Sequence, residues 1–267
     1  MFQKIEYSLA RIIDKLLPSA AVKPLRDTWR EWRGNPEITV ARYLCDPSRL
    51  ALDIGANSGF FTHDLARSSA GCEAFEPNPI LVKLLEESCK GEAVRIHSCA
   101  LSDRQQQTDL VIPTIEGNDY LGLATIEPDN QFHGVEIRKF TVDCYPLDSF
   151  NFSPVGFIKI DVEGHELAVI KGAQKTIERD QPNFLIESEE RHKPGAVENL
   201  LNYFSNCGYE GFFMLGRQIL PIDKFSLVLH QPDSSIQFDK ILPGKTYANN
   251  FIFTKNQAAI AKWQRVV

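Results

Sequence analysis

Short runs of apolar residues alternate with segments of helical periodicity along most of the chain. Continuous or alternating apolar runs predict strands, whereas apolar positions three and four residues apart predict helices. The predicted strands cover residues 50–54, 73–75, 93–97, 155–160, 184–186, 209–215 and 251–254. The predicted helices cover residues 37–45, 60–67, 79–90, 166–179 and 196–206. Because strands that alternate with helices form β–α–β units, the pattern predicts an α/β fold, with a mostly parallel sheet and helices on both faces.

Two polar segments interrupt this alternation. Residues 113–136 and 218–248 are rich in glycine, proline and other turn-forming residues, and connections of that length are usually functional or disordered. Ligands of open α/β sheets bind outside the carboxyl ends of the strands. We therefore expect both insertions to cap the acceptor side of a cleft and to be more mobile than the sheet, with Asn118, Tyr120 and His133 contacting the acceptor.

The start of the chain has a pattern of its own. Apolar residues at helical spacing predict an amphipathic helix, formed by Phe2, Ile5, Leu9, Ile12, Ile13 and Leu16. The charged residues between them exclude a secretion signal. Such a stripe most often packs on its own domain or on a second subunit in a homodimer, and less often lies in a membrane interface. We divide the chain into an N-terminal helical extension, residues 1–36, and a domain over residues 37–267.

The composition is that of an ordinary globular protein, with 43% hydrophobic and 24% charged residues. Its 29 basic and 35 acidic residues give a net charge of −6, which disfavours binding to a nucleic acid backbone. No apolar stretch is long enough to cross a membrane. The six cysteines form no CxxC pair, which is typical of reduced thiols in a cytoplasmic protein. Cysteines and histidines lack metal-ligand spacing, so we predict no metal.

The sequence LDIGANSGFFT at residues 52–62 ends a strand, turns on glycines and opens a helix. Gly55 and Gly59 let the backbone approach a ligand closely. The middle glycine of the nicotinamide fingerprint GxGxxG is missing. Asp53 precedes the turn, where an acid can bind the ammonium group of S-adenosylmethionine. We therefore predict that Asp53, Gly55, Asn57 and Gly59 bind S-adenosylmethionine rather than NAD.

The ends of the next two predicted strands complete an adenosyl site. The sequence FEPNP at residues 75–79 places Glu76, followed by Asn78, at the end of the second strand. A carboxylate there can accept hydrogen bonds from both ribose hydroxyls, although a solvated acid at a helix N-terminus is an alternative. After the third strand, Leu101 and Ser102 lie where an adenine ring would be flanked.

Charged residues follow two later strands. With a period of two, Lys159 and Asp161 point to the same side of the sheet, where burial requires a partner or a function. A structural pair of Lys159 with a carboxylate and an active-site role for the cluster are both open. The strand at 184–186 runs into Glu187, Glu189, Glu190, Arg191 and His192. Two neighbouring strand ends that carry carboxylates and histidines predict the floor of an active site.

These motifs resemble the FkbM family of S-adenosylmethionine-dependent methyltransferases. The resemblance is carried by LDIGANSGFFT at 52–62, FEPNP at 75–79, ALSD at 100–103, FIKIDVEGHELAVIKGA at 157–173 and IE at 186–187. It covers roughly residues 37–255. The resemblance implies the class I methyltransferase (Rossmann-like) fold, a seven-stranded sheet whose last strand pair is antiparallel. It also implies O-methylation of a hydroxyl on a sugar, glycoconjugate or natural product.

Methyl transfer to a hydroxyl is helped by a group that takes its proton. The candidates are Asp161, His165, Glu187 and His192. We expect Asp161 and Glu187 to orient the hydroxyl and either His165 or His192 to take the proton. Because His165 begins a predicted helix, the helix dipole disfavours its protonated form, and a structural contact at the helix cap is equally consistent.

Two other functions remain open at this point. A ribose 2′-O-methyltransferase acting on RNA can use Lys, Asp and Glu together, but the net charge of −6 and the lack of a basic stripe argue against it. A non-catalytic subunit that binds the cofactor and stabilises an active homologue would have no use for paired charges at strand ends. The favoured function is a cytoplasmic O-methyltransferase that acts on a hydroxylated small molecule or glycan.

Overall fold

The computed structural model describes residues 35–115, 117–128, 130, 132, 134–237 and 240–256. The predicted helix within residues 1–16 lies outside this part of the chain, as does His133. No helix in the described ranges is long and apolar enough to cross a bilayer.

An eight-stranded sheet forms the centre of the fold, in the order β11-β10-β14-β9-β8-β1-β2-β3. Its strands are β1 (Leu50–Ile54), β2 (Cys72–Phe75), β3 (Val94–His97), β8 (Val155–Ile160), β9 (Asn183–Glu187), β10 (Glu210–Leu215), β11 (Gln218–Pro221) and β14 (Asn250–Thr254). The strands from β3 to β9 are parallel, and β14 is antiparallel to both β9 and β10. The α/β fold with a mixed sheet is thus confirmed, but the expected count of seven strands is one too low. Gly216, with φ of 62°, allows a tight hairpin after β10, which adds β11 to the edge.

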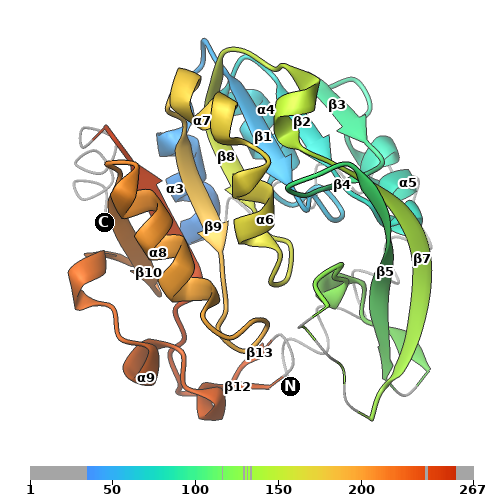
Figure 1. The fold of residues 1–267 in the computed structure, drawn as a ribbon, viewed down its shortest axis with the longest axis vertical. Helices are drawn as coiled ribbons and strands as arrows, with labels where there is room; N and C mark the ends of the chain where they lie inside the picture. The colour runs from blue at the N-terminus through green and yellow to red at the C-terminus, as the bar shows by residue number, and fades with distance from the viewer. Residues whose placement is uncertain are drawn as a thin grey trace.

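Helices cover both faces of the sheet (Figure 1). One face carries α3 (Pro36–Leu44), α4 (Thr62–Ser68) and α5 (Pro79–Ser88), and the other carries α6 (Glu166–Lys171), α7 (Gln174–Asp180) and α8 (Ala196–Asn206). The prediction of one helix over 166–179 is wrong, because the helix breaks after Lys171. The carboxylate of Asp148 accepts hydrogen bonds from the backbone N–H groups of Lys175 and Thr176, at 2.9 Å each, and so starts a new helix.

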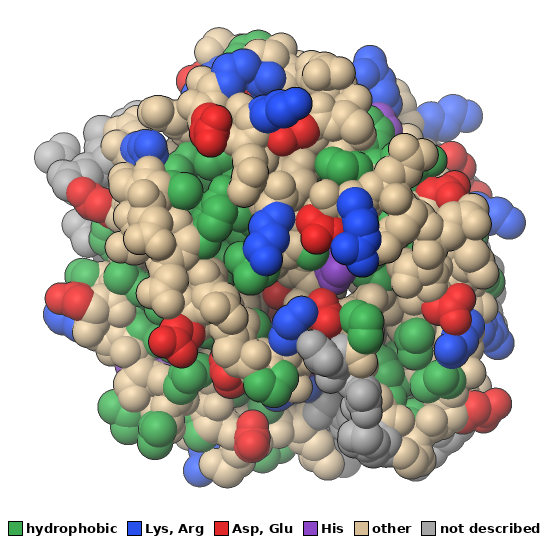
Figure 2. Space-filling model, in the orientation of Figure 1, with side chains coloured by type: hydrophobic (Ala, Val, Ile, Leu, Met, Phe, Trp, Pro, Cys, Tyr) green, Lys and Arg blue, Asp and Glu red, His purple; other side chains and the backbone are tan. Residues whose placement is uncertain are grey.

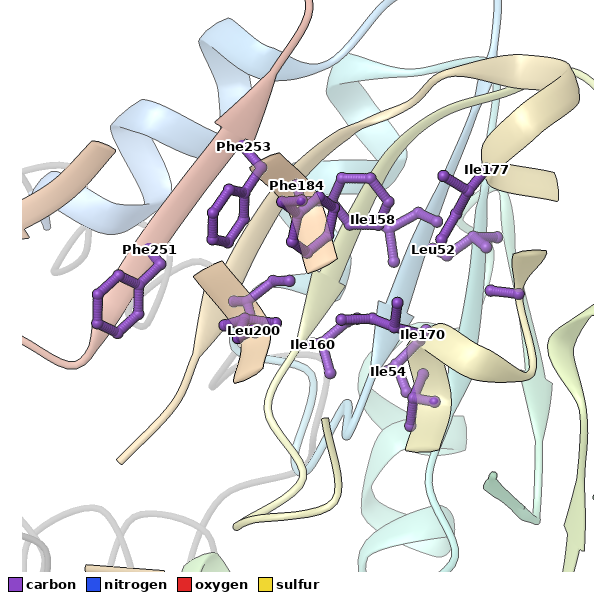
Figure 3. Packing of buried hydrophobic residues seen from close by; sticks show 14 of the residues in the cluster. Leu52, Ile54, Ile158, Ile160, Ile170, Ile177, Phe184, Leu200, Phe251 and Phe253 are labelled. Carbon is purple, nitrogen blue, oxygen red and sulfur yellow. The ribbon is translucent and has the colours of Figure 1, made fainter. Parts of the chain in front are cut away.

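The largest part of the core lies between the sheet and α6–α8. Leu52, Ile54, Ile158 and Ile160 project from neighbouring strands toward these helices (Figure 3). Residues of the opposite parity on β1, β8 and β9 face α3 and α4, where Ala51, Phe157 and Leu185 are fully buried. Since side chains alternate along a strand, Asp53 and Lys159 also lie on the α3–α4 face.

A second sheet stands beside the carboxyl ends of the parallel strands. It consists of β4 (Ala100–Leu101), β5 (Gln106–Ile115), β6 (Asn118–Asp119) and β7 (Glu136–Tyr145), and Figure 1 shows β5 and β7 as its long antiparallel pair. The short helix η1 (Leu121–Leu123) folds onto it, with Leu121, Ala124 and Ile126 packed against a small core of Leu110, Ile112 and Val142. The segment 113–136 therefore begins and ends in strands of this sheet.

The segment 218–248 forms β11 and a series of short elements. These are η3 (Ile222–Lys224), α9 (Leu227–His230), η4 (Asp233–Ser235), β12 (Ile236–Gln237) and β13 (Lys240–Ile241); a further short helix, η2 (Leu147–Phe150), precedes β8. The amide of Gln231 donates hydrogen bonds to the backbone oxygens of Ser188, at 2.8 Å, and Ala248, at 2.9 Å. The segment is therefore fastened next to the carboxyl end of β9.

Replacing Phe204 with alanine should destabilise the fold. Phe204 is fully buried, and its ring stacks on that of Phe253 with the centroids 4.0 Å apart. Loss of a buried aromatic ring costs roughly 3–5 kcal/mol. Urea unfolding should show this loss for Phe204→Ala, while Leu84→Ala, at a side chain that is 44% exposed, should leave the free energy of unfolding nearly unchanged. Equal stability of the two variants would contradict the packing described here.

Candidate active site

The turn after β1 passes too close to the end of β8 to allow a side chain. Gly55 has a φ of +79°, and a Cβ atom on it would lie 1.8 Å from the backbone oxygen of Asp161. Gly59 has a φ of +88°, and a Cβ there would lie 2.9 Å from Cδ1 of Leu85. Asn57 also has a positive φ, of 51°, a region that asparagine tolerates better than most residues. The predicted glycine turn is thus required by the close approach of β1 and β8.

Glu76 is buried at the end of β2 with both carboxylate oxygens engaged. Oε2 accepts a hydrogen bond from the backbone N–H of Asn57, and Oε1 accepts one from that of Asn78, each at 2.8 Å. Only 5% of the residue is exposed, which excludes the alternative of a solvated acid. Burial raises the pKa of Glu76 to about 7, although the two N–H groups oppose this shift. Asn78 caps α5 by accepting from the N–H of Ile80 at 3.0 Å.

A pocket opens at the carboxyl ends of β1, β2 and β8, with about 610 Å³ of space between the protein atoms when its open solvent is included. The parallel sheet and its following loops supply Gly55, Asn57, Phe75, Glu76, Asp161, Glu163 and His165, and β4 supplies Leu101. The second sheet closes the pocket with Leu110, Leu121, Gly122, Ala124, Thr125 and Ile126. Figure 2 shows a hollow in the middle of this face of the molecule, with acidic, basic and histidine side chains around it.

The structure places several of the predicted cofactor and acceptor residues outside the lining of the pocket. Asp53 is 1% exposed and does not line it; its carboxylate accepts a hydrogen bond from Oγ1 of Thr62 at 2.6 Å. Ser102 is also 1% exposed, and its hydroxyl lies 2.9 Å from Nε2 of His165. Asn118 lies in β6 and Tyr120 follows it, and neither lines the pocket.

The buried ammonium of Lys159 pairs with Asp161, whose side chain is 30% exposed, at the end of β8. The Lys159 ammonium is 2.9 Å from Oδ2 of Asp161 and 4.6 Å from the centroid of the Phe61 ring. Burial lowers the pKa of Lys159, but the carboxylates of Asp161, Asp53 and Glu187 outweigh it and raise that pKa above its ordinary value. The structural pair that the sequence left open therefore exists, and Asp161 at the same time lines the pocket.

Glu187 follows β9 and faces the same cluster. Its Oε1 accepts a hydrogen bond from the amide of Asn249 at 2.6 Å. Burial raises the pKa of Glu187 well above its ordinary value, and the negative charges of Asp161 and Glu163 raise it further. Carboxylates thus outnumber the single ammonium of Lys159 at this end of the sheet, and a cationic ligand would balance the charge.

The two predicted histidines have different surroundings. Nε2 of His165 contacts the Ser102 hydroxyl at 2.9 Å and Nδ1 contacts Oε2 of Glu127 at 3.0 Å, so both ring nitrogens are engaged. His165 occupies the N-cap position of α6, but its side chain makes no capping hydrogen bond. Nδ1 of His192 lies 3.2 Å from Oε2 of Glu163. Burial lowers the pKa of His192 to about 4, although the Glu189 carboxylate opposes this.

Two further carboxylates belong to the site and were missed from the sequence. Glu127 joins His165 to Lys193, whose ammonium is 3.0 Å from Oε1 of Glu127. Glu163 lines the pocket next to Asp161. The period-two pattern of Lys159, Asp161 and Glu163 could have indicated Glu163, whereas Glu127 lies in an insertion that has no regular pattern.

The family model for the methyltransferase FkbM domain matches residues 53–210, more than half of the chain. The chain belongs to the FkbM family of methyltransferases. Its cofactor is therefore S-adenosylmethionine, and its second substrate is a methyl acceptor. Among curated proteins no match was found.

Solved structures of other methyltransferases are similar to this FkbM-family chain. The methyltransferase FkbM from Methylobacillus flagellatus KT is 17% identical, with a TM-score of 0.46; the match covers 78% of this chain but only 44% of that one. A Streptococcus mutans protein, solved in complex with SAH, is 12% identical with a TM-score of 0.45, over 81% of this chain and 94% of that one. An rRNA methylase from Streptococcus thermophilus is 10% identical with a TM-score of 0.44, over 81% and 92% of the two chains.

The residues of this FkbM-family pocket fit S-adenosylmethionine. The turn at Gly55 leaves no room for a Cβ and so presents bare backbone to the pocket. Glu76 offers buried carboxylate oxygens that can accept further hydrogen bonds from ribose hydroxyls. The apolar side chains of Phe75, Leu101 and Ile126 suit an adenine ring, and the surplus of carboxylates around Asp161 suits the sulfonium and ammonium charges. No metal-binding group of three or more His, Cys, Asp or Glu side chains occurs within the described ranges.

Replacing Glu76 with alanine should weaken cofactor binding. Loss of two charge-assisted hydrogen bonds to the ribose corresponds to roughly 2–4 kcal/mol of binding free energy. Isothermal calorimetry with S-adenosylhomocysteine measures this directly. Glu86→Ala, at an exposed glutamate of the neighbouring α5, serves as the control and should bind normally. Wild-type affinity in a folded Glu76→Ala protein would remove Glu76 from the cofactor site.

Cofactor affinity should also depend on pH through Glu76. The free protein holds the pKa of Glu76 at about 7, and ribose hydroxyls donate better to the ionised form, so binding lowers that pKa. The contribution of Glu76 to cofactor affinity is therefore complete at pH values above 8. It is lost as the pH falls through about 7, and the affinity then decreases by at most tenfold per pH unit. In calorimetry with S-adenosylhomocysteine, Glu76→Gln should lack this part of the pH dependence. Parallel pH curves for the two proteins would contradict the assignment.

Proposed function

We propose that this FkbM-family enzyme is an O-methyltransferase whose acceptor is a hydroxyl of a sugar, glycoconjugate or natural product. The observation that carries the proposal is the group of carboxylates at the carboxyl ends of β8 and β9. Asp161 and Glu163 line the pocket and Glu187 lies beside them. A hydroxyl needs hydrogen-bond acceptors to orient it and a group to take its proton, and this end of the pocket is rich in both.

The charge of the site argues against a nucleic acid acceptor. Carboxylates repel the phosphates of an RNA backbone, and the whole chain has a net charge of −6. A ribose 2′-O-methyltransferase needs cationic side chains that follow the backbone, but Lys159 is buried and paired with Asp161. A neutral hydroxylated molecule suits the site better.

The residues that we assign to the reaction act by position and by proton transfer. S-adenosylmethionine, when bound, supplies an activated methyl group. Asp161, held by Lys159, orients the acceptor hydroxyl from the wall of the pocket, and Glu187, held by Asn249, lies next to it outside the lining. Of the two histidines expected to take the proton, His165 has both ring nitrogens engaged, and burial lowers the pKa of His192 to about 4, so neither is a strong base. The second sheet excludes water from the pocket, which favours transfer over side reactions.

We place the enzyme in the cytoplasm. The support is that all six cysteines are free thiols, four of them buried, as is usual in a reducing compartment.

Incubation with labelled S-adenosylmethionine and a panel of acceptors tests the proposal. The panel contains mono- and oligosaccharides, glycolipids, hydroxylated polyketides and RNA. We expect label to enter an ether on one of the non-nucleic-acid classes. Asp161→Asn, which removes the carboxylate that orients the hydroxyl, should lower that rate by roughly 10²-fold, whereas Asp109→Asn, at a carboxylate paired with Lys139 on the outer part of the second sheet, should not. Label in RNA alone, or on nitrogen or carbon, would refute the acceptor class.

A further inference from the structure

The backbone of Glu163 is held in an unfavourable conformation by three parts of the molecule. Its φ is +54°, a left-handed conformation that costs free energy for a residue with a side chain. Its carbonyl oxygen accepts hydrogen bonds from Oγ1 of Thr125 and from the amide of Asn130, at 2.9 Å each. Gly164 follows with a φ of +103°, and a Cβ on it would lie 3.2 Å from Cβ of His192 and 3.3 Å from Cγ of Glu127. Such strain is typical of residues that a functional site holds in place.

This conformation puts the carboxyl group of Glu163 in the wall of the pocket, against a histidine. Glu163 lines the pocket beside Asp161, and 14% of its side chain is exposed. Its Oε2 is buried, lies 3.2 Å from Nδ1 of His192, and accepts no well-aligned hydrogen bond from any described group. The two side chains therefore form a buried carboxyl–imidazole pair next to the pocket that Glu163 lines.

We infer that Glu163 is the catalytic proton acceptor of the methyl transfer, with His192 as the buried partner that holds its carboxyl group in place. This inference rests on the proposed function and deepens it, because it assigns the proton of the acceptor hydroxyl to Glu163 rather than to His165 or His192. Glu163 takes the hydroxyl proton as the acceptor oxygen bonds to the methyl carbon, whose bond to sulfur breaks with the electron pair left on sulfur. The neutral product sulfur and the protonated carboxyl then conserve the charge of the pocket.

The other carboxyl groups are less suited to this role. Asp161 is already engaged with the Lys159 ammonium, at 2.9 Å. Glu187 does not line the pocket. Burial raises the pKa of Glu163 well above its ordinary value, and the charges of Asp161 and Glu189 raise it further, against the opposing charge of Arg191. A carboxyl group with a raised pKa is a better match to proton uptake near neutral pH.

The electrostatic surroundings of Glu163 come from several elements. The charged or titratable groups near it are Lys159 and Asp161 at the end of β8, Glu166 on α6, Glu187 at the end of β9, Glu189, Arg191 and His192 after β9, and Glu127 beside Gly164. Burial lowers the pKa of His192 to about 4, so its ring is neutral above pH 5. A proton gained or lost near neutral pH by this pair therefore resides on Glu163.

The protonation of Glu163 can be seen in the tautomer of His192. When Glu163 is protonated, its hydroxyl donates to Nδ1, and the neutral ring carries its proton on Nε2. When Glu163 is ionised, it accepts from Nδ1–H instead. At 3.2 Å a small rotation of either side chain aligns this hydrogen bond, and we then expect the tautomer of His192 to change as Glu163 titrates, while the ring stays neutral.

Nitrogen-15 NMR of the histidine rings tests the inference between pH 5 and 9. In the wild-type protein, Nδ1 of His192 should change from unprotonated to protonated as the pH rises, with no cationic ring at any pH. In Glu163→Gln, this change should be absent. His165, whose ring is held between Ser102 and Glu127, is the internal control, because its signals should be the same in both proteins at every pH. A fixed His192 tautomer in the wild-type protein, or a ring that becomes cationic, would overturn the inference without any need for the variant.

Binding of a cation should move this transition. Saturation with sinefungin, whose amine is positive where S-adenosylmethionine carries its sulfonium, should shift the tautomer change to lower pH by about one unit or more relative to S-adenosylhomocysteine. Equal transitions with the two ligands would show that Glu163 does not face the reacting sulfur. These measurements need no acceptor, so they remain decisive if the acceptor panel fails.

Once an acceptor is known, Glu163→Gln should lower the rate of single-turnover methylation by roughly 10²–10⁴.

Discussion

Lys159 carries its ammonium group into the interior of the fold, where only 2% of the residue is exposed and an unpaired charge would cost several kcal/mol. The carboxylate of Asp161 pairs with it two residues later on the same side of the chain. The pair therefore fixes Asp161 at the end of β8, in the wall of the pocket. Burial raises the pKa of Asp53, Glu37 and Glu187 nearby, and the same ammonium opposes that rise in each of them. One cation thus organises a site that has more negative than positive charge.

Close backbone contacts bring the remaining parts of the site together. Gly55 lies against the carbonyl of Asp161, so the cofactor turn and the end of β8 are parts of one surface. Gly164 leaves room for both Glu127 and His192, and Thr125 hydrogen-bonds to the carbonyl of Glu163. The sheet that carries the cofactor residues and the sheet that covers the pocket are therefore joined at residues 163–165. The same three residues supply the pocket with a carboxylate and a histidine.

The sequence predicted the elements whose apolar pattern is local and continuous. Strands such as 50–54 and 155–160 are buried on both faces, and their apolar runs match the observed bounds. The long pair of β5 and β7 was missed, because β7 is largely exposed and its polar residues interrupt any alternation. The break between α6 and α7 was missed because Asp148, which caps α7, comes from another part of the chain.

In the candidate site, too, short local motifs could be predicted from the sequence, and contacts between distant segments could not. The turn at Gly55 and the carboxylate of Glu76 follow directly from short motifs, and the structure places both in one pocket. The sequence does not show that Asp53 lies behind the pocket, bonded to Thr62. Nor does it show the contact of Glu127 with His165, which joins residues 38 positions apart. Such contacts depend on how distant segments pack, which no local pattern encodes.

A crystal structure of the full chain with S-adenosylhomocysteine would test the central claim most directly. The account predicts that the ribose hydroxyls bind the carboxylate of Glu76, that residues 121–126 cover the adenosine, and that the sulfur faces the open side shared by Asp161 and Glu163. A ligand with its sulfur turned away from these two carboxylates, or bound outside this pocket, would contradict it.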